Sequence, residues 1–427
     1  MRVLVIGAGL GGVPMAYELR NLLDRSVEVV MVNDREKFQF VPSLPWVAVG
    51  WRTREAVEVD LPPIFRKKGI EFIASAAQQI LPAENRVVLA NGQSIEYDYL
   101  VIAVGPALAF DEIEGLGPAG ASASICSIDH ASAANDAWQA FVADPGPMVI
   151  GATQGASCFG PAYEFAMIAD TELRRRKIRH AVPMTFVTSE PYIGHLGLGG
   201  VGDTKGMLES ELRSRHIKWL TNAKVKQISA EQVMVETCDD AGAVVKEVAV
   251  PSKFTMFIPP FRGIDALKAA GELVNPRGFV IIDKHQRNPT YKNVFGIGVC
   301  VAIPPVEVTP VPTGCPKTGY MIESMVAATA HNIKRMIDGK EPDEEATWNA
   351  ICLADFGDSG AAFVAVPQIP PRNVNWASQG KWVHLAKVAF EKYFLHKVRV
   401  GMKEPFYERY ILKHLGVTQL KAKTKVG

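Results

Sequence analysis

A cysteine lies where a nucleotide-binding turn is expected. Residues 147–151 (PMVIG) have the composition of a buried strand, and a helical run begins near Pro161. The turn between them places Thr153 where a dinucleotide fold requires a second glycine, the residue that lets a pyrophosphate approach the backbone. Cys158 ends the turn near the helix N-terminus, where the helix dipole favours a thiolate. The segment therefore predicts a dinucleotide fold that has lost its NAD site and carries a reactive thiol instead.

Two other cysteines are candidates for the same chemistry. Cys352 lies in a short apolar segment, and Cys126 is expected on a strand between the two halves of the chain. Contact between Cys158 and either of them cannot be deduced from spacing, and a buried, inert thiol is the commoner state of each. Without CxxC or zinc-ligand spacing, the six cysteines predict neither a disulfide scaffold nor a metal site. The sequence supports no role for the remaining three, which are Cys238, Cys300 and Cys315.

The N-terminus carries an intact dinucleotide motif. An apolar strand, RVLVIG, runs into Gly7-x-Gly9-x-x-Gly12, and helical spacing follows. Gly7 makes the tight turn, Gly9 admits the pyrophosphate, and Gly12 lets the helix and the strand pack closely. At the end of the second strand, Asn33 stands in place of the usual ribose-binding carboxylate, and Asp34 follows it. The sequence therefore predicts a dinucleotide cofactor bound by these five residues.

Two later segments favour FAD over NAD as that cofactor. Residues 97–106 indicate a strand that stops at Gly105-Pro106, and residues 293–298 indicate another that ends at Gly298. Both resemble segments of flavoproteins with two dinucleotide folds, although Val299 stands where an aspartate usually contacts the flavin ribityl chain. Each segment alone could be an ordinary buried parallel strand. Their order and spacing after the N-terminal motif predict FAD.

The composition is that of a folded protein of several domains. The chain has 427 residues, of which 48% are hydrophobic and 21% are charged. No stretch reaches the roughly 18 apolar residues that a membrane-spanning helix needs, and we expect no cleavable signal peptide because the first strand begins at residue 2. We expect an α/β fold with two Rossmann-like dinucleotide-binding domains and a C-terminal region with an amphipathic, membrane-binding helix. The expected divisions are residues 1–145 (FAD-binding domain, first part), 146–285 (second Rossmann-like domain), 286–340 (return segment of the FAD-binding domain) and 341–427 (C-terminal region).

The C-terminal segment combines positive charge with apolar helical faces. Residues 381–427 hold eleven Lys and Arg against three Asp and Glu, although the whole chain has a net charge of only +1. Residues 382–400 place aromatic and aliphatic side chains at helical spacing with lysines between them, and residues 406–415 repeat the pattern. Such helices lie in the headgroup plane of a bilayer. The alternative is that both helices pack on the core with solvated lysines; the aromatic spacing argues against nucleic acid as the anionic partner.

Six motifs spread over the chain resemble the sulfide:quinone oxidoreductase family. They are FQFVPSLPWVAVGW (38–51), GASCFGPAYE (155–164), PYIGHLG (191–197), PVPTGCPKTGYMIES (310–324), CLADFGD (352–358) and WVHLAKVAFEKYF (382–394). The resemblance implies a monotopic FAD enzyme on a prokaryotic cytoplasmic membrane. Such an enzyme oxidises hydrogen sulfide to polysulfide or elemental sulfur and reduces ubiquinone or a related membrane quinone. Whether the chain forms a homo-oligomer stays open.

The same resemblance assigns roles to individual residues. It maps the redox-active cysteine pair onto Cys158 and Cys352, a third family cysteine onto Cys126, and a lysine beside the flavin ring onto Lys317. Hydrosulfide would attack the oxidised pair and leave a persulfide on one cysteine and a thiolate on the other, from which two electrons pass to FAD. The apolar residues expected around the quinone are Pro42, Phe390 and Tyr407.

Proton transfer and overall function have alternatives. Glu164, His130 and His195 are candidate bases, although a structural hydrogen-bonding role is as common for each. A quinone-reducing NADH dehydrogenase would share both folds but needs the glycine turn that Thr153 interrupts. The flavin subunit of a cytochrome-linked sulfide dehydrogenase would carry a secretory signal and lack the amphipathic helix. A non-catalytic carrier or sensor of sulfane sulfur would keep FAD without reducing quinone.

Overall fold

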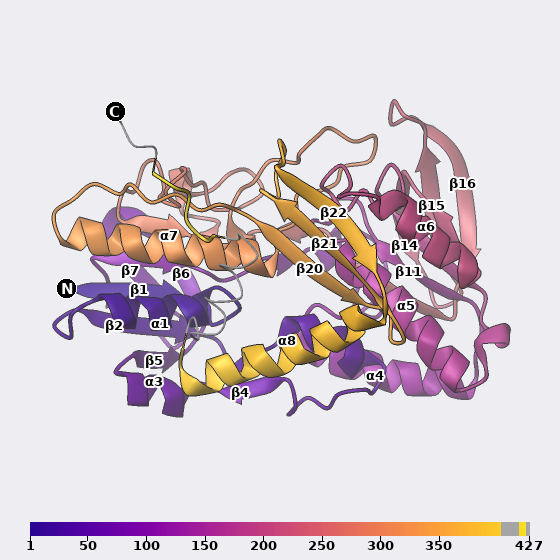
Figure 1. Cartoon of the computed structure of the whole chain (residues 1–427), viewed down its shortest axis with the longest axis horizontal. Coiled ribbons are helices and arrows are strands. Elements are labelled where there is room, and N and C mark those ends of the chain that lie inside the picture. The colour runs from indigo at the N-terminus through magenta and orange to yellow at the C-terminus, as the bar shows by residue number, and fades with distance from the viewer. Residues whose placement is uncertain (403–417, 424–427) are drawn as a thin grey trace.

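The structure, a computed structural model, describes residues 1–402 and 418–423. Figure 1 shows two units of sheet and helix side by side, with a long helix near the C-terminus lying across them. The second amphipathic stretch expected at residues 406–415 lies outside the described residues. Among the described helices, none combines the length and the hydrophobicity that crossing a bilayer requires.

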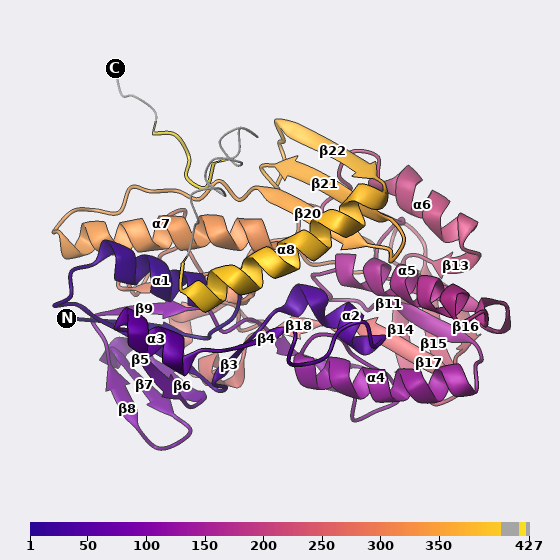
Figure 2. The same cartoon turned by 60° about the horizontal axis from the view of Figure 1, so that its bottom comes forward.

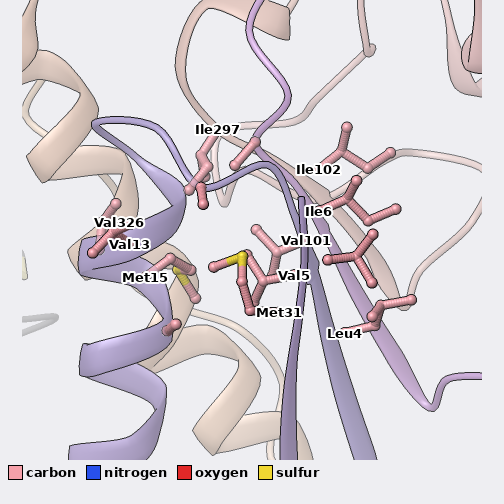
Figure 3. Close-up of a cluster of buried hydrophobic side chains, with 14 of the residues drawn as sticks. Leu4, Val5, Ile6, Val13, Met15, Met31, Val101, Ile102, Ile297 and Val326 are labelled. Atoms are coloured by element: carbon pink, nitrogen blue, oxygen red, sulfur yellow. The ribbon is translucent and has the colours of Figure 1, made fainter. Parts of the chain in front are cut away.

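The first sheet is five-stranded and parallel, with the order β19-β9-β1-β2-β5. Apolar runs such as RVLVI form its strands because both faces of a parallel sheet are covered. Helix α1 (Gly12–Leu22) packs on the sheet, and α7 (Gly319–Ile337) packs against α1. Figure 3 shows Val5, Met15 and Val326, from β1, α1 and α7, in one buried cluster. The strands are β1 (Arg2–Ile6), β2 (Glu28–Asn33), β5 (Glu71–Ala74), β9 (Tyr99–Ile102) and β19 (Val294–Gly296). Strands β1 and β2 confirm the first two predicted strands, and β9 and β19 confirm the strands predicted within residues 97–106 and 293–298.

The second sheet is four-stranded and parallel, with the order β13-β12-β11-β17. Strand β11 (Met148–Ala152) is buried along its whole length and confirms the strand predicted at residues 147–151. Helix α5 (Gly160–Arg175) follows the Cys158 turn, as predicted. The other elements of this unit are β12 (Met184–Thr188), β13 (Ile217–Leu220), β17 (Phe254–Ile258), α4 (Ile128–Ala143), α6 (Thr204–Ser214) and the antiparallel strands β14 (Ala223–Ile228), β15 (Gln232–Cys238) and β16 (Val244–Pro251).

The third sheet and the last described helix connect the two units. Strands β20 (Ala350–Asp355), β21 (Gly360–Val366) and β22 (Val374–Gln379) are antiparallel, and α8 (Lys381–Val400) contacts β20 and β21. Figure 2 shows α8 running from this sheet towards α1 and α3 (Pro62–Lys68). The Tyr17 hydroxyl of α1 donates a hydrogen bond to the Val398 carbonyl at 2.9 Å, which fastens the far end of α8.

Short elements complete the chain. They are the strands β3 (Lys37–Gln39), β4 (Glu58–Asp60), β6 (Ala77–Leu81), β7 (Arg86–Leu89), β8 (Ser94–Glu96), β10 (Ala107–Leu108) and β18 (Phe261–Arg262), the helix α2 (Leu44–Ala48), and 3₁₀ turns at Val41–Ser43, Pro82–Glu84, Phe110–Glu112, Arg179–Ala181, Asp265–Leu267, Gly271–Leu273 and Gly298–Cys300. The expectation that Cys126 lies on a strand is wrong. Cys126 lies in a bend, because Ser127 caps α4 directly after it by accepting the His130 N–H.

Helix α8 exposes the N-terminal half of its predicted apolar face and buries Phe394 of the same face in the core. Trp382, Leu385 and Phe390 are exposed, as their place on the predicted apolar face allows for a membrane-facing helix. Two of the lysines between them, Lys387 and Lys397, are buried and ion-paired with acidic residues of α5 and α7. The expectation that these two lysines meet solvent or headgroups is therefore wrong, because carboxylates from other helices hold them inside.

Candidate active site

The N-terminal glycine turn has the shape that a pyrophosphate requires. Gly7 adopts a left-handed conformation with φ +97°, and a Cβ on Gly12 would lie 1.7 Å from the Gly7 carbonyl oxygen. A Cβ on Gly9 would meet no atom within 4 Å, so the backbone at Gly9 is open on that side. The turn leads directly into α1, whose N-terminus favours an anion. These residues fit the pyrophosphate of FAD.

The two residues predicted to bind the ribose, Asn33 and Asp34, lie at the end of β2 in different environments. The Asn33 side chain accepts the Ala8 N–H at 2.9 Å and donates to the Arg35 carbonyl at 2.8 Å. Asn33 thus braces the glycine turn from inside. The Asp34 side chain is exposed, which leaves its carboxylate as the freer hydrogen-bond acceptor of the two. A ribose contact by either residue stays a prediction.

Gly105, Gly298 and Lys317 border the same edge of the first sheet. Gly105 follows β9 and Gly298 follows β19, and both have positive φ. Because the carboxyl ends of parallel strands meet at one edge, the two turns lie beside the glycine turn of Gly9. Lys317 precedes α7, and its Nζ lies 5.2 Å from the centroid of the Phe279 ring. Burial lowers the pKa of Lys317, and the thiols of three cysteines (Cys158, Cys300 and Cys315) interact with its charge.

Cys158 is brought within electrostatic range of two thiols from distant segments, Cys352 and Cys126. Cys158 lies two residues before α5, Cys352 lies on β20, and Cys126 lies just before α4. A charge on Cys158 raises the pKa of Cys352, and a charge on Cys126 raises the pKa of Cys158. The Phe363 ring packs against both apolar clusters that hold these thiols. The six cysteines, all within the described residues, are free thiols.

The expected preference of Cys158 for the thiolate is wrong for this structure. Burial raises the pKa of Cys158 to about 12, and the charges of Cys126 and Glu164 raise it as well, while Lys317 lowers it. Burial likewise raises the pKa of Cys352 to about 12. In both cysteines desolvation of the charged form is the largest effect on the pKa. An uncombined thiolate therefore needs the nearby ammonium groups, whereas a disulfide carries no charge to stabilise.

The second dinucleotide turn is filled by protein. Thr153 is buried and donates both its N–H and its hydroxyl to the Ile258 carbonyl, at 3.1 and 3.3 Å. The Gly155 N–H donates to the Pro312 carbonyl, and the Gly314 N–H donates to the Ala156 carbonyl, each at 2.9 Å. Residues 312–314 thus lie directly on the turn, where the pyrophosphate of NAD would otherwise approach.

Glu164 has a buried cationic partner. The Lys387 ammonium of α8 is hydrogen-bonded to the Glu164 carboxylate of α5, and both side chains are at least 93% buried. Burial raises the pKa of Glu164 to about 7 against the opposing effect of Lys387, and the charge of Asp355 raises it further. The charge of Glu164 reaches Cys158 and that of Lys387 reaches Cys352. The pair therefore adjoins the thiols and can hold a proton near neutral pH.

Asp355 and His384 extend this cluster towards the surface. The Asp355 carboxylate is fully buried and accepts the Trp46 indole N–H and the His384 Nδ1–H, each at 2.7 Å. The His384 side chain is 30% exposed. Sequence reasoning missed Lys387, Asp355 and His384. No sequence signal distinguished them, because charged residues at 384, 387 and 391 on an amphipathic helix are also what a solvent-facing side would show.

The two predicted histidine bases lie in separate environments. His195 is buried, and its Nε2 lies 2.7 Å from Glu307 Oε1 while its Nδ1 accepts the Gly197 N–H at 3.1 Å. His130 lies on α4, with its ring 5.5 Å from the centroid of Phe110 and its buried Nδ1 without a hydrogen-bond partner. Burial lowers the pKa of both histidines. Their described contacts join neither of them to the three thiols.

The expected quinone residues come from two segments that meet. The Phe40 and Phe390 rings lie 5.9 Å apart, and the Ser43 hydroxyl donates to Glu391, so the turn holding Pro42 lies beside α8. Tyr407 lies outside the described residues. Elsewhere, a cavity of about 1130 Å³ opens at the amino ends of β11, β12 and β13. Its lining includes none of the described residues that the sequence assigns to the site.

Comparison with known proteins gives close relatives. The family described as pyridine nucleotide-disulphide oxidoreductase matches residues 1–331. The chain is 48% identical over 413 residues to the sulfide-quinone reductase of Aquifex aeolicus, which covers 96% of this chain and 94% of that protein. The X-ray structure of the sulfide:quinone oxidoreductase of that bacterium matches with a TM-score of 0.95 at 46% identity, over 100% of this chain and 98% of the other. The mitochondrial sulfide:quinone oxidoreductase of Mus musculus is 26% identical over 314 residues, 71% of this chain and 66% of its own length.

Proposed function

Because the chain belongs to the pyridine nucleotide-disulphide oxidoreductase family and, within it, to the sulfide-quinone reductases, we propose that it oxidises sulfide and reduces a membrane quinone. It is an FAD-dependent oxidoreductase with an α/β flavoprotein fold. Bound FAD supplies the two-electron carrier between the two substrates. The observation that supports the residue assignments is the electrostatic interaction of Cys158 with Cys352, which lies 194 residues later in the chain, and with Lys317, the lysine proposed to border the flavin.

The thiols supply the sulfide half of the reaction. In the oxidised pair, hydrosulfide attacks one sulfur of the Cys158–Cys352 bond, which gives a persulfide on one cysteine and a thiolate on the other. The Lys387 and Lys317 ammonium groups stabilise that thiolate, because each interacts with the charge of one member of the pair. Cys126, whose charge acts on Cys158, is the proposed acceptor of sulfane sulfur from it. Lys317 also offers a fixed positive charge where negative charge develops on the reduced cofactor.

The quinone half is assigned to the face where α8 meets the Pro42 turn. Phe390 and Pro42 offer apolar contacts there, and Tyr407 is proposed to complete them. The exposed apolar side chains of these two segments are Val41, Trp382, Leu385 and Phe390. Exposed Lys392 and Arg399 of α8 supply positive charge beside them. An apolar face with a basic border suits a peripheral protein that rests on a bilayer, where quinone is dissolved.

The proposed functions are assigned to successive parts of the chain. Residues 1–145 and 286–340 form the proposed FAD-binding domain, residues 146–285 carry Cys158 in a Rossmann-like domain without an NAD site, and residues 341–427 bind quinone and membrane. The loop that covers Thr153 supports the loss of the NAD site. That loop also disfavours a quinone-reducing NADH dehydrogenase, which must bind a nucleotide at this turn.

An anaerobic titration tests the function. Sulfide is added to the FAD-loaded protein, the flavin absorbance is followed, and a short-chain quinone is then added. We expect sulfide to bleach the flavin at two electrons per FAD and quinone to restore it, while NADH does neither. Flavin that stays oxidised with excess sulfide would overturn the proposal, and bleaching without reoxidation by quinone would indicate a carrier or sensor.

A further inference from the structure

The Asp355–His384 pair has no part in the chemistry described so far, yet it lies between that chemistry and solvent. Asp355 is fully buried on β20, three residues after Cys352, and its Oδ1 accepts the His384 Nδ1–H at 2.7 Å. With Nδ1 acting as the donor, Nε2 is the nitrogen free to exchange a proton. The His384 side chain is 30% exposed, so solvent reaches this group.

Two connections join this pair to the buried Glu164–Lys387 pair. The Glu164 carboxylate accepts a hydrogen bond from the Asp355 backbone N–H. His384 and Lys387 are three residues apart on α8, which places their side chains on adjacent turns of one helix face. The Trp46 ring lies between the two pairs, because its N–H donates to Asp355 while the Lys387 ammonium lies 5.6 Å from its centroid.

The proposed reaction needs such a connection. Hydrosulfide loses two electrons and one proton to give sulfane sulfur, and a quinone takes up two electrons and two protons to give a quinol. One further proton must therefore come from solvent in each turnover. A quinone site on a face covered by lipid has no water beside it, so the protein has to conduct that proton.

We propose that His384 and Asp355 form the solvent-facing end of a proton relay whose buried end is the Glu164–Lys387 pair. This inference rests on the proposed quinone reduction. His384 takes a proton from water at Nε2 and gives its Nδ1 proton to Asp355. The proton then passes to Glu164, which lies within electrostatic range of Asp355 and delivers it towards the quinone. His384 acts through these carboxylates and is a positioning and proton-transfer residue that does not touch the substrate.

The groups that set the charge along the relay come from several elements. Titratable or charged side chains packed around it are Arg52 over the Trp46 ring, Cys158 before α5, Cys352 and Asp355 on β20, Glu164 on α5, and His384, Lys387 and Glu391 on α8. Of these, His384 combines partial solvent exposure with an imidazole that can take up a proton at one ring nitrogen while the other is hydrogen-bonded to Asp355. The substitution His384→Gln therefore removes the proton exchange while leaving a side chain that can still donate to Asp355.

The test separates the two halves of the reaction in stopped-flow experiments on the FAD-loaded protein. We expect His384→Gln to leave flavin reduction by sulfide at the native rate. Reoxidation by a short-chain quinone should slow by roughly tenfold to a hundredfold at neutral pH, slow further as pH rises, and recover on addition of free imidazole. His396→Gln is the matched control, because His396 is an exposed histidine of the same helix and should behave as native.

Three results would overturn the relay. These are native reoxidation by His384→Gln across the pH range, slowing that imidazole does not relieve, and equal slowing of both half-reactions, which would indicate a structural role. If His384→Gln does not fold, the native protein provides the test. The absence of a solvent deuterium isotope effect on its reoxidation by quinone would also overturn the relay. Failure of the proposed function is distinguishable, since the native protein would then not be reduced by sulfide at all.

Discussion

Replacing Lys387 by methionine should make the stability of the protein strongly dependent on pH. Lys387 and Glu164 are both more than 90% buried, so their ion pair is shielded from solvent and salt. Methionine keeps most of the apolar volume of the lysine stem and removes only the charge. The substitution therefore isolates the effect of leaving the Glu164 carboxylate without its cation.

The size of the stability loss depends on whether Glu164 stays charged or binds a proton in the variant. Removing one partner of a buried pair costs about 3–5 kcal/mol if the other stays charged. Glu164 can avoid that cost by binding a proton, because its pKa is about 7 even with Lys387 present. Without Lys387, whose charge and hydrogen bond lower the Glu164 pKa, we expect this pKa to rise further, as for buried unpaired glutamates.

The sign of the pH effect follows from linkage. A carboxyl whose pKa is higher in the folded than in the unfolded state loses stability as pH rises, until the folded pKa is reached. In the native protein this loss ends near pH 7. In Lys387→Met it continues above pH 7 at about 1.4 kcal/mol per pH unit. The destabilisation relative to the native protein should thus be smallest at pH 6 and grow through pH 8.

Denaturant unfolding followed by FAD release at pH 6, 7 and 8 measures this effect. Lys392→Met, at an exposed position of the same helix, is the control and should change stability by less than about 0.5 kcal/mol. Adding Glu164→Gln to Lys387→Met should restore most of the lost stability and remove the pH dependence. Equal losses at pH 6 and pH 8, or a double variant no more stable than the single one, would refute the reasoning.

Three further outcomes are expected. Cys158→Ala and Cys352→Ala should each retain FAD and abolish flavin reduction by sulfide, as followed in the anaerobic titration, because neither variant can form the pair. Trp382→Gln combined with Leu385→Gln should weaken binding to anionic lipid vesicles in a flotation assay by at least roughly tenfold, since each exposed side chain contributes about 1–2 kcal/mol when buried in lipid, while sulfide-dependent flavin reduction stays native. Thr153→Gly should not confer flavin reduction by NADH, measured by absorbance, because the loop at residues 312–314 still covers the turn.

Controls for these variants come from the same chain. Cys238→Ala, at the end of β15, should reduce flavin like the native protein, and a native rate in either Cys158→Ala or Cys352→Ala would refute its assignment to the pair. Lys246→Gln on exposed β16 should leave vesicle binding unchanged. Undiminished vesicle binding by the double α8 variant would place the membrane contact elsewhere. Deleting residues 381–427 is a poor test of that contact, because the inner side of α8 fills part of the core through Phe394 and Val398.

Much of the fold could be predicted because its signals are local. The turn at Gly7, Gly9 and Gly12 is dictated by steric limits within a few residues. The buried strands are recognisable as apolar runs between turns. The failure of the second turn was equally readable at Thr153. What covers that turn was not, because the covering residues 312–314 lie more than 150 positions further along the chain and only the fold brings them to it.

Helix α8 shows where pattern reasoning stops. Its periodicity correctly predicted a helix with an apolar face, but periodicity cannot say which face is buried. The carboxylates of Glu164 and Glu323 hold Lys387 and Lys397 inside, whereas Trp382, Leu385 and Phe390 are exposed and Phe394 is buried. A buried lysine is strongly destabilising unless a carboxylate neutralises its charge. Here each carboxylate belongs to another helix, which periodicity within α8 cannot reveal.

The sequence by itself determined the dinucleotide turn, the strands and helices, and the residue types available for sulfur and proton chemistry, since each depends on sterics and hydrophobicity over short stretches. Tertiary structure alone decided that Cys158 lies within electrostatic range of Cys352 and Cys126, that burial disfavours their thiolates, and that Glu164, Lys387, Asp355 and His384 form one connected cluster. Proximity and desolvation are properties of neighbours in space, and the neighbours that matter here are contributed by segments that the chain order keeps apart.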